Sequence, residues 1–421
     1  MKKSRAYRTT RVKNVDWDRI LQGREGQACW VGMDVSKDDV RAVLRWPDGE
    51  FERPWLVANP QEVGLWSTIL ARLAMERALT VALEPSGTYG DAMRQALQDV
   101  GITPRRVSAK AARDFAEVFD GVPSQHDGKD AAVVAELAAL GKSVPWPCEA
   151  SSESDQQLAL WVDWLDIHRR ESVTWCGRLE GLLARHWPEA WRNLTVRSAT
   201  LLQLLAHYGG PAPLASDPQA ARRLARWGGR FLSREKIQQL LGDAQSSQGV
   251  RQTAYDLERM RKYAAKALAA RGEVRRARRE LRLLGRKNAM IQAIEPVVGL
   301  ITACVLYVYL GDPRDYHCGA AYRKAMGLNL KERSSGRWQG QLKITKRGHP
   351  QVRRWLYLSA LRSIRKARLW TWYQAKKEKD RGRPRGALVG IMRRLALAIY
   401  RVRVSGEPFE AERLFPGRKR A

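Results

Sequence analysis

The sequence has no long apolar run. A membrane-spanning helix requires roughly 18 consecutive apolar residues, and no stretch approaches that length, so we expect no membrane span and no membrane partner. The basic N-terminus, M-K-K-S-R-A-Y-R-T-T-R, is followed by no apolar segment of the kind that a secretory signal contains. We therefore interpret residues 1–24 as a basic arm.

Cysteine is scarce, and its spacing excludes two classes of small protein. The five cysteines, at positions 29, 148, 176, 304 and 318, are odd in number and never form a C-x-x-C pair. This pattern argues against a disulfide framework and against a structural zinc site. It favours a reducing compartment, so we expect the protein in the cytoplasm.

Acidic residues are rare at the C-terminal end. Residues 331–421 contain 26 lysines and arginines but six acids, whereas the whole chain of 421 residues has a net charge of +31. About two thirds of the excess charge therefore lies in the last fifth of the chain. Such a concentration predicts a polyanionic partner there, because binding to nucleic acid is driven by neutralising phosphates.

Residues 25–150 carry a pattern of strands and helices that predicts a mixed α/β sheet. Expected strands are 28–35, 39–46, 51–57, 79–83 and 105–108, and expected helices are 60–77, 89–100, 109–119 and 127–140. The first three strands form a meander, and the later strands alternate with helices.

Four acids fall at conspicuous places in this domain: Asp34 inside the first strand, Glu84 after the fourth, and Asp127 and Asp130 where the last helix begins. If the first and fourth strands are neighbours, Asp34 and Glu84 come together, and the helix can bring its acids to the same edge. Clustered carboxylates repel one another unless cations are present, and one or two Mg²⁺ ions would suit them. Taken singly, Asp34 could be a polar strand end, and Asp127 and Asp130 could serve as helix caps.

Residues 151–290 are predicted to be helical. A long amphipathic helix is expected over 158–186, with shorter ones over 219–226 and 236–241. Between 251 and 290, two sets of residues recur at heptad spacing: Met260, Ala267, Val274 and Leu281, and Tyr263, Ala270, Ala277 and Leu284. This coiled-coil seam could pack against a second helix of the same chain or against another copy.

Residues 291–400 form a third, mainly α-helical domain, followed by a basic tail over 401–421. Ile294 to Leu310 reads as a glycine-containing turn and then a buried apolar helix, and basic helices are expected over 351–368 and 386–401. Between them lies the run S-S-G-R-W-Q-G-Q-L-K-I-T-K-R-G-H-P, from Ser334 to Pro350. By itself, Ser334-Ser335-Gly336 reads as an ordinary turn.

Taken together, these motifs resemble a known family. The motifs that carry the resemblance are D-V-S-K with Asp34, L-E-P-S-G with Glu84, H-D-G-K-D-A with Asp127 and Asp130, and P-V-V-G-L-I-T-A followed by S-S-G and G-Q-L-K-I-T-K-R-G-H-P. The chain resembles the DEDD transposases of bacterial insertion-sequence family one-hundred-and-ten, the bridge-RNA-guided recombinases. The resemblance covers roughly residues 28–400. The chain departs from the family at His126, where threonine is usual, and at Pro296 to Gly299, where P-G-I-G is usual.

The resemblance implies a RuvC-like domain of RNase H fold, a helical coiled-coil insert and a C-terminal transposase domain. It implies that the four acids bind Mg²⁺ and that Ser335, or else Ser334, attacks a DNA phosphodiester to form a phosphoserine link. A structured guide (bridge) RNA would pair with target and donor double-stranded DNA, and the protein would act as a dimer or tetramer. Six basic residues would hold phosphates around the serine: Arg333, Arg337, Lys343, Lys346, Arg347 and Arg353.

Two other functions are compatible with these residues. One is a Mg²⁺-dependent junction nuclease of the RuvC type, in which water attacks and the basic domain only grips DNA. The other is a nucleic-acid-binding protein without catalytic activity, against which the four intact acids argue.

Overall fold

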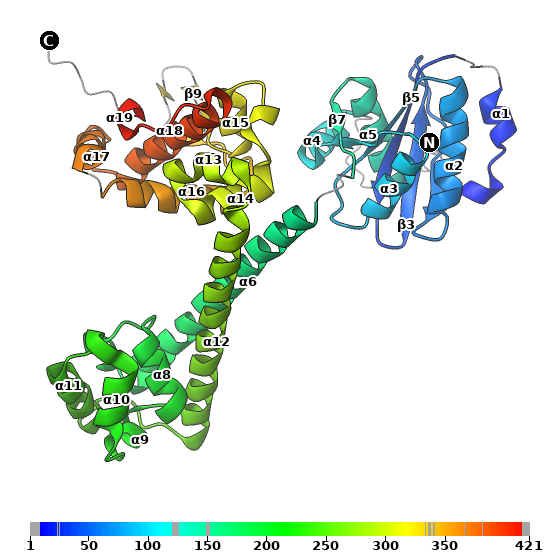
Figure 1. Ribbon diagram of the computed structural model, residues 1–421. Coiled ribbons are helices and arrows are strands. Elements are labelled where there is room, and N and C mark those ends of the chain that lie inside the picture. Colours follow the sequence, from blue (N-terminus) through cyan, green and yellow to red (C-terminus); the bar gives the residue numbers. More distant parts are fainter. Residues whose placement is uncertain are drawn as a thin grey trace, which may run out of the picture. The chain divides into compact units, whose positions relative to one another are not determined.

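The computed structural model describes residues 9–22, 24, 26–119, 126–148, 152–332, 334–335, 338–339, 342–365, 367–380 and 382–414. At residues 21, 334–335, 338–339, 367–368 and 412–413 it describes the backbone alone. The chain forms two compact units, Met1–Ala150 and Ser151–Ala421 (Figure 1).

The first unit is built on a mixed sheet, as the sequence predicts. Its described strands are β1 (Thr10–Arg11), β2 (Cys29–Val35), β3 (Asp39–Arg45), β4 (Trp55–Ala58), β5 (Leu79–Leu83), β6 (Arg105–Val107) and β7 (Ser143–Pro145), in the order β1-β4-β3-β2-β5-β6-β7. Strands β2, β3 and β4 form an antiparallel meander, whereas β5 and β6 run parallel to β2. The predicted adjacency of the first strand and the strand before Glu84 is thus confirmed.

The third strand is shorter than predicted. It begins at Trp55, and Phe51 forms only an isolated bridge with Arg45. Pro54 separates the two segments, and proline has no amide hydrogen to give to a strand ladder. The expected strand over 51–57 was therefore too long at its start.

Helices cover both faces of the sheet. Helices α2 (Val63–Glu76) and α3 (Asp91–Asp99) pack on one face, where Trp66 and Met93 join a core with the odd-numbered residues of β2. Helices α4 (Ala109–Phe119) and α5 (Asp127–Ala139) pack on the other face, where Val133 shares a core with Ala82 of β5.

Part of the segment expected to be a basic arm belongs to this core instead. Strand β1 pairs with β4, and a short turn, η2 (Val12–Asn14), and helix α1 (Trp17–Leu21) follow it. The ring of Trp17 lies 4.8 Å from that of Trp55 and 5.6 Å from that of Trp66. The charge pattern did not reveal these apolar anchors, which hold the segment against the sheet.

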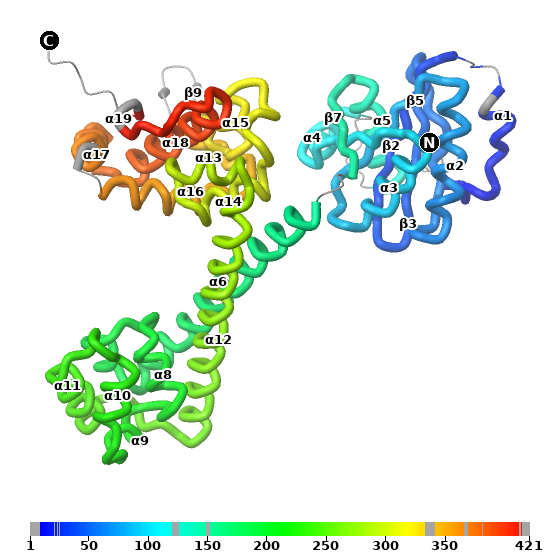
Figure 2. Tube along the Cα trace, in the orientation of Figure 1, coloured from blue at the N-terminus to red at the C-terminus, as the bar shows by residue number. Residues whose placement is uncertain are grey.

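Two long helices organise the second unit. Helix α6 (Glu153–His186) and helix α12 (Ala254–Gly285) run antiparallel along each other (Figure 2). Near one end of the pair, Leu158 shares a core with Leu281, and near the other end the ring of Trp175 lies 5.3 Å from that of Tyr263. Most of the predicted heptad positions of α12 are buried. Packing within the chain is therefore observed, and association with another copy stays a prediction.

A small helical group caps one end of this pair. It consists of α7 (Ala190–Asn193), α8 (Ala199–Tyr208), α9 (Pro211–Ala215), α10 (Ala220–Gly228), η3 (Gly229–Phe231) and α11 (Arg234–Gln245). Leucines of α8, α10 and α11 share one core with Cys176 and Leu183 of α6 and with Met260 of α12.

A second helical group lies at the other end. It contains α13 (Ala289–Val298), α14 (Leu300–Leu310), η4 (Pro313–Asp315), α15 (Gly319–Ala325), α16 (Pro350–Ser363), α17 (Ala367–Lys379), α18 (Pro384–Ser405) and α19 (Ala411–Leu414). The segment before Gly299 is helical rather than a turn, and Gly299, with φ of +82°, separates α13 from α14. Helix α18 continues four residues beyond the predicted end. Among the described residues, no helix is long and apolar enough to cross a membrane.

Candidate functional site: an acidic cluster and a serine hairpin

The alternation of side chains along β2 decides which way Asp34 faces. Cys29, Val31 and Met33 lie in the core beneath α2 and α3. Successive residues of a strand point to opposite faces of the sheet, so Asp34 lies on the face that α5 covers. An acid in this strand is therefore directed at the start of a helix rather than into the larger core.

Glu84 reaches the same edge because β5 runs parallel to β2. Met33 is paired with Leu83, and the amide of Glu84 donates a hydrogen bond of 3.4 Å to the carbonyl of Met33. The pairing places Glu84 beside Asp34, and the negative charge of Glu84 contributes to the raised pKa of Asp34. The acids from two strands far apart in the sequence thus meet at one end of the sheet.

Helix α5 approaches β2 so closely because Gly32 has no side chain. A Cβ atom at position 32 would lie 2.2 Å from the carbonyl oxygen of Ala131 and 2.3 Å from the amide nitrogen of Ala135. Any larger residue would push the helix away. The close contact brings Asp127 and Asp130, in the first turn of α5, to Asp34: one carboxylate oxygen of each lies within 4.8 Å of the others.

His126 caps this helix in place of the threonine that is usual in the resembling family. Its Nδ1 accepts a hydrogen bond of 3.1 Å from the amide of Gly128. A capping side chain satisfies an amide that the helix itself leaves unpaired. The departure therefore preserves the start of α5, and with it the position of both aspartates.

The cluster carries an electrostatic cost. Burial, together with the negative charges of Asp130, Glu84, Asp127 and Asp39, raises the pKa of Asp34 to about 6. Burial and Asp130 raise the pKa of Glu84, and burial and Asp127 raise that of Asp130. Groups that resist ionisation in this way are stabilised by a cation at the same place.

Two basic residues that sequence reasoning missed lie beside the acids. Arg41 is paired across the sheet with Asp34, and its Nε lies 3.8 Å from Oδ2 of Asp127. Lys129, only 2% exposed, lies between the two aspartates of α5, and its charge lowers the pKa of Asp130. The sequence does show a lysine between two acids. It does not show that this lysine is buried beside them, because that depends on how α5 packs against the sheet.

The donor set fits a small divalent cation. Oxygens at about 2.1 Å from an octahedral Mg²⁺ lie roughly 3 to 4 Å apart, and the carboxylates of Asp34, Asp127 and Asp130 approach this spacing. All donors are hard oxygens, as Mg²⁺ prefers, and Asp127 is 66% exposed, so that water has access. Glu84 is not one of the three residues whose carboxylate oxygens lie within 4.8 Å of one another, but it is close enough to raise the pKa of Asp34.

The predicted serines lie in the second unit, in a β-hairpin. Strand β8 (Leu330–Lys331) pairs antiparallel with β11 (Lys343–Ile344), and β9 (Ser334–Ser335) pairs antiparallel with β10 (Trp338–Gln339). Because Ser335 is paired with Trp338, the backbone of Ser335 lies next to the tip of the hairpin. The side chains of Ser334 and Ser335, and the residues Arg333 and Arg337, lie outside what the structure describes.

The other predicted phosphate ligands divide into two groups. Lys343, Lys346 and Arg347 are exposed at the base of the hairpin, and Lys346 has a positive φ of 56°. Arg353 is half-buried and donates a hydrogen bond of 2.6 Å to the carbonyl of Gly348. Arg353 therefore braces the segment that follows the hairpin, and its role as a phosphate ligand stays a prediction.

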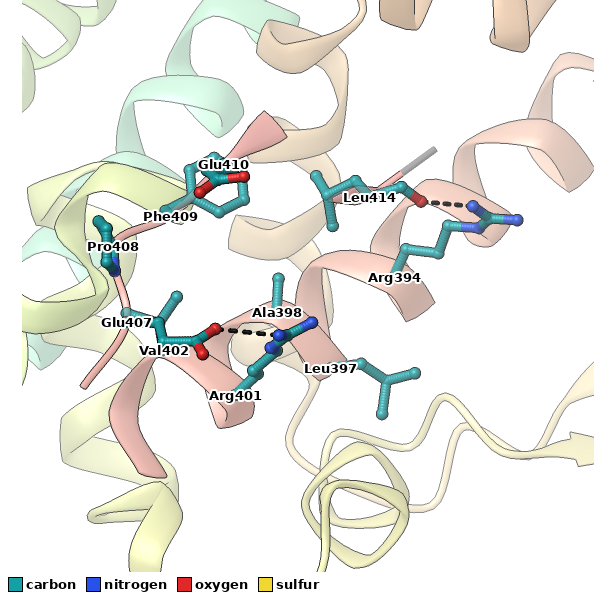
Figure 3. Close-up of a pocket in the computed structure, with 10 residues that line it drawn as sticks. All are labelled: Arg394, Leu397, Ala398, Arg401, Val402, Glu407, Pro408, Phe409, Glu410 and Leu414. Carbon is teal, nitrogen blue, oxygen red and sulfur yellow. Dashed lines mark hydrogen bonds and ion pairs between the residues drawn. The ribbon is translucent and has the colours of Figure 1, made fainter. Parts of the chain in front are cut away.

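A pocket of about 350 Å³ lies elsewhere in the second unit, between α18 and residues 407–414 (Figure 3). Arg401 and Glu407 form an ion pair of 2.9 Å at its edge, and Phe409 contributes to its apolar lining. No residue predicted to act in chemistry or to bind phosphate lines it.

Comparisons with known proteins bear on both units. Residues 291–375 match the family described as Transposase IS116/IS110/IS902 family. The chain is 25% identical, over 352 residues, to the insertion element IS110 uncharacterized 43.6 kDa protein of Streptomyces coelicolor, covering 80% of this chain and 84% of that protein. Both matches are to proteins of IS110-type insertion elements.

Among solved structures, the chain is similar to T. thermophilus RuvC in complex with a Holliday junction substrate. The similarity covers 28% of this chain and 99% of that one, at 14% sequence identity and a TM-score of 0.23.

Proposed function

We propose that this chain, in which residues 291–375 carry the IS110-type transposase match, is a Mg²⁺-dependent, RNA-guided DNA recombinase that works through a phosphoserine intermediate. The observation that carries the proposal is the meeting of Asp34, Asp127 and Asp130, with Glu84 beside them, in a chain that also carries that match. An acidic cluster alone would suit many metal-dependent enzymes. The match narrows the substrate class to DNA.

The strand order supports assigning the first unit to a RuvC-like domain of RNase H fold. An antiparallel meander, β2 to β4, continues through β2 into the parallel strands β5 and β6, with helices on both faces. The acids come from the central strand, from its parallel neighbour and from the last helix. This arrangement gathers ligands at one end of the sheet, where a nucleic-acid backbone can approach them.

Asp34, Asp127, Asp130 and Glu84 would hold Mg²⁺, which supplies Lewis acidity at a phosphate oxygen and stabilises negative charge that develops during transfer. The four carboxylates would fix the place of the cation, and so the place where a phosphodiester could be held. Arg41 and Lys129 limit their mutual repulsion and keep the carboxylates in place.

The serine supplies the nucleophile in this proposal. The hydroxyl oxygen of Ser335 attacks the phosphorus and loses its proton, the bond from phosphorus to the sugar oxygen breaks, and that oxygen takes up a proton. A serine hydroxyl is a weak nucleophile and must be activated. Because the phosphoserine bond retains the energy of the broken phosphodiester, the strand can be rejoined to a new end without ATP.

Guide RNA and multimeric assembly complete the proposal. A structured RNA encoded beside the gene would pair with donor and target DNA and select the sites. Acids of one subunit would act with the serine of another. The basic residues Lys343, Lys346 and Arg347, exposed beside the hairpin, are suited to hold the phosphates on either side of the reacting one.

The test is strand exchange by the full-length protein with its guide RNA, Mg²⁺ and two DNA duplexes. Ser335→Ala should abolish exchange and the protein–DNA adduct on a denaturing gel while preserving nucleic-acid binding, and Ser334→Ala is the matched control. Asp34→Asn should abolish both strand exchange and the protein–DNA adduct. Free 5′-phosphate ends without an adduct would instead indicate a water-using nuclease, and Mg²⁺-independent binding alone would indicate a protein without catalytic activity.

A further inference from the structure

Three arginines gather near the junction of α13 and α14 without an acidic partner. Arg278 and Arg282 lie one turn apart on α12, and Arg362 comes from α16. Within the described part of the chain, no carboxylate lies within ion-pairing distance of any of these guanidinium groups. Other arginines of α12 are paired, for example Arg259 with Asp256 at 3.0 Å and Arg279 with Glu280 at 3.2 Å.

Packing explains why Arg278 and Arg282 stand beside α14. Residues three and four apart share one face of a helix, so Arg278, Leu281, Arg282 and Gly285 form one row. Leu281 is fully buried, and its carbonyl accepts a hydrogen bond from the thiol of Cys304. Gly285 faces the same cysteine and Leu300. The buried members of the row therefore seat α12 on α14, and the two arginines extend from the margin of the contact to solvent.

Arg362 is held rigidly at the same place. Its Nη2 donates to the carbonyl of Val298 at 2.8 Å, to Oγ1 of Thr302 at 3.2 Å and to Oγ of Ser359 at 3.0 Å. Its Nη1 is aimed at the turn, because a Cβ atom built on Gly299 would lie 3.4 Å from it. These bonds fix the guanidinium before any ligand arrives, which reduces the entropy cost of binding an anion.

The charges of the group repel one another. Desolvation, together with the positive charges of Arg282 and Arg362, lowers the pKa of Arg278. The start of α14 adds to the positive field, since no side chain caps the helix at Gly299. Three cations kept together at such a cost are stabilised when an anion neutralises them.

We infer that Arg278, Arg282 and Arg362 form a binding station for backbone phosphates of nucleic acid, separate from the serine hairpin. Guanidinium groups bind phosphate oxygens in paired hydrogen bonds, and one hydrogen-bonded arginine beside two exposed ones suits successive phosphates of a strand. The contacts are to the backbone and so carry no sequence information. This inference rests on the proposed function in taking nucleic acid as the partner, and it adds two arginines of α12 that lie outside the strongly basic residues 331–421.

The experiment uses the full chain with two probes, a 20-base-pair DNA duplex and an RNA duplex of the same sequence. Binding is measured by fluorescence anisotropy over a series of NaCl concentrations. Arg278→Gln with Arg282→Gln is compared with Arg222→Gln and Arg226→Gln, which remove the same charge at the same spacing from α10, at the other end of the α6–α12 pair. Both pairs are exposed, so the folded state should persist in each.

We expect the first pair to weaken binding at least about tenfold more than the control pair, since a hydrogen bond to a charged group contributes about 1.5 to 3 kcal/mol. The slope of log K against log salt should fall by about 1 to 2, since each lost phosphate contact removes about 0.9 on B-form DNA. If Arg278→Gln with Arg282→Gln weakens binding to only one of the two duplexes, the station is assigned to DNA or to RNA accordingly. Equal loss in both pairs would overturn the inference, because diffuse charge would then account for binding.

A second measurement needs no variant. Phenylglyoxal modifies accessible arginines, and mass spectrometry reports their protection in the wild-type chain when either probe is bound. Arg278 and Arg282 should be protected and Arg222 of α10 should not; modification of all three at unchanged rates would refute the station. A wild-type chain that binds through these arginines but performs no strand exchange would count against the proposed function alone.

Discussion

Gly32 lies so close to Ala131 that a Cβ atom on the glycine would stand 2.2 Å from the alanine's carbonyl oxygen. This one contact seats α5 on β2. Asp34 comes two residues after Gly32 on β2, and Asp127 and Asp130 come just before Ala131 on α5. The same contact therefore fixes the positions of the three aspartates relative to one another.

Gly32→Val should therefore damage both stability and activity. The added side chain must displace backbone atoms of α5, and overpacking of this kind costs about 1 to 3 kcal/mol or more. We expect a lower midpoint in urea unfolding and the loss of Mg²⁺-dependent strand exchange. Gly64→Ala is the control, because a Cβ atom there meets nothing within 4 Å. Wild-type stability and activity in Gly32→Val would contradict this account of the site.

The raised pKa of Asp34 predicts how stability depends on pH when no divalent metal is present. Its pKa is 3.8 when unperturbed and about 6 in the folded chain, so the folded state binds the proton more tightly. The associated stabilisation is complete below about pH 4 and is lost as the pH rises through 6. Asp34→Asn should remove this loss and raise the free energy of unfolding by on the order of 2 kcal/mol at pH 7.5.

Urea unfolding in EDTA at pH 5, 6 and 7.5 measures this difference. Glu84 and Asp130, whose pKa values are also raised, should contribute a residual dependence of the same sign in Asp34→Asn. A wild-type free energy of unfolding that increases from pH 5 to pH 7.5 more steeply than that of Asp34→Asn would reverse the predicted sign.

Divalent cations should stabilise the folded first unit. A ligand that binds only the folded state raises stability by about 2.7 kcal/mol at a hundred times its Kd. We expect Mg²⁺ and Mn²⁺ to raise the unfolding temperature at pH 7.5, and to do so less at pH 5, where Asp34 is protonated. The shift should vanish in Asp34→Asn with Asp130→Asn. Asp91→Asn, outside the cluster, should keep it; equal shifts in both variants would exclude a site at these acids.

The ion pair of Asp312 and Arg403 should stabilise the second unit. Burial acts to raise the pKa of Asp312, but hydrogen bonds from Arg403 and Arg314 outweigh it and lower the pKa to about 2. Both side chains of the Asp312–Arg403 pair are less than one fifth exposed. Asp312→Asn should therefore cost about 2 kcal/mol at pH 7, and the wild-type contribution should be lost as the pH falls from about 4 to 2.

Thermal unfolding of Asp312→Asn at pH 7 and pH 3 provides the measurement. Glu258→Gln is the matched control: its pair with Lys262 spans one helical turn of α12, with both side chains more than half exposed. Exposed pairs of this kind contribute about 0 to 1 kcal/mol. If the two substitutions cost the same, burial of the Asp312–Arg403 pair has no measurable effect.

The sequence by itself determined the local features of this protein. Alternation over residues 39–46 and the apolar run around Asp34 predicted strands, and heptad spacing predicted the long helix α12. Asp34, Glu84, Asp127 and Asp130 could be named because acids beside apolar runs are costly unless paired. The charge of residues 331–421 predicted a polyanionic partner. Each of these follows from neighbouring residues and from the periods of helix and strand.

Only the tertiary structure decided what faces what. It showed that α12 packs on α6 within the chain, that residues 10–21 join the sheet, that Lys129 is buried beside Asp130, and that Arg278 and Arg362 stand together. These relations join residues far apart in the sequence, and no local pattern specifies them. They arise when apolar faces are buried together, because the contacts that result, such as Gly32 against α5, fix the positions of the polar groups beside them.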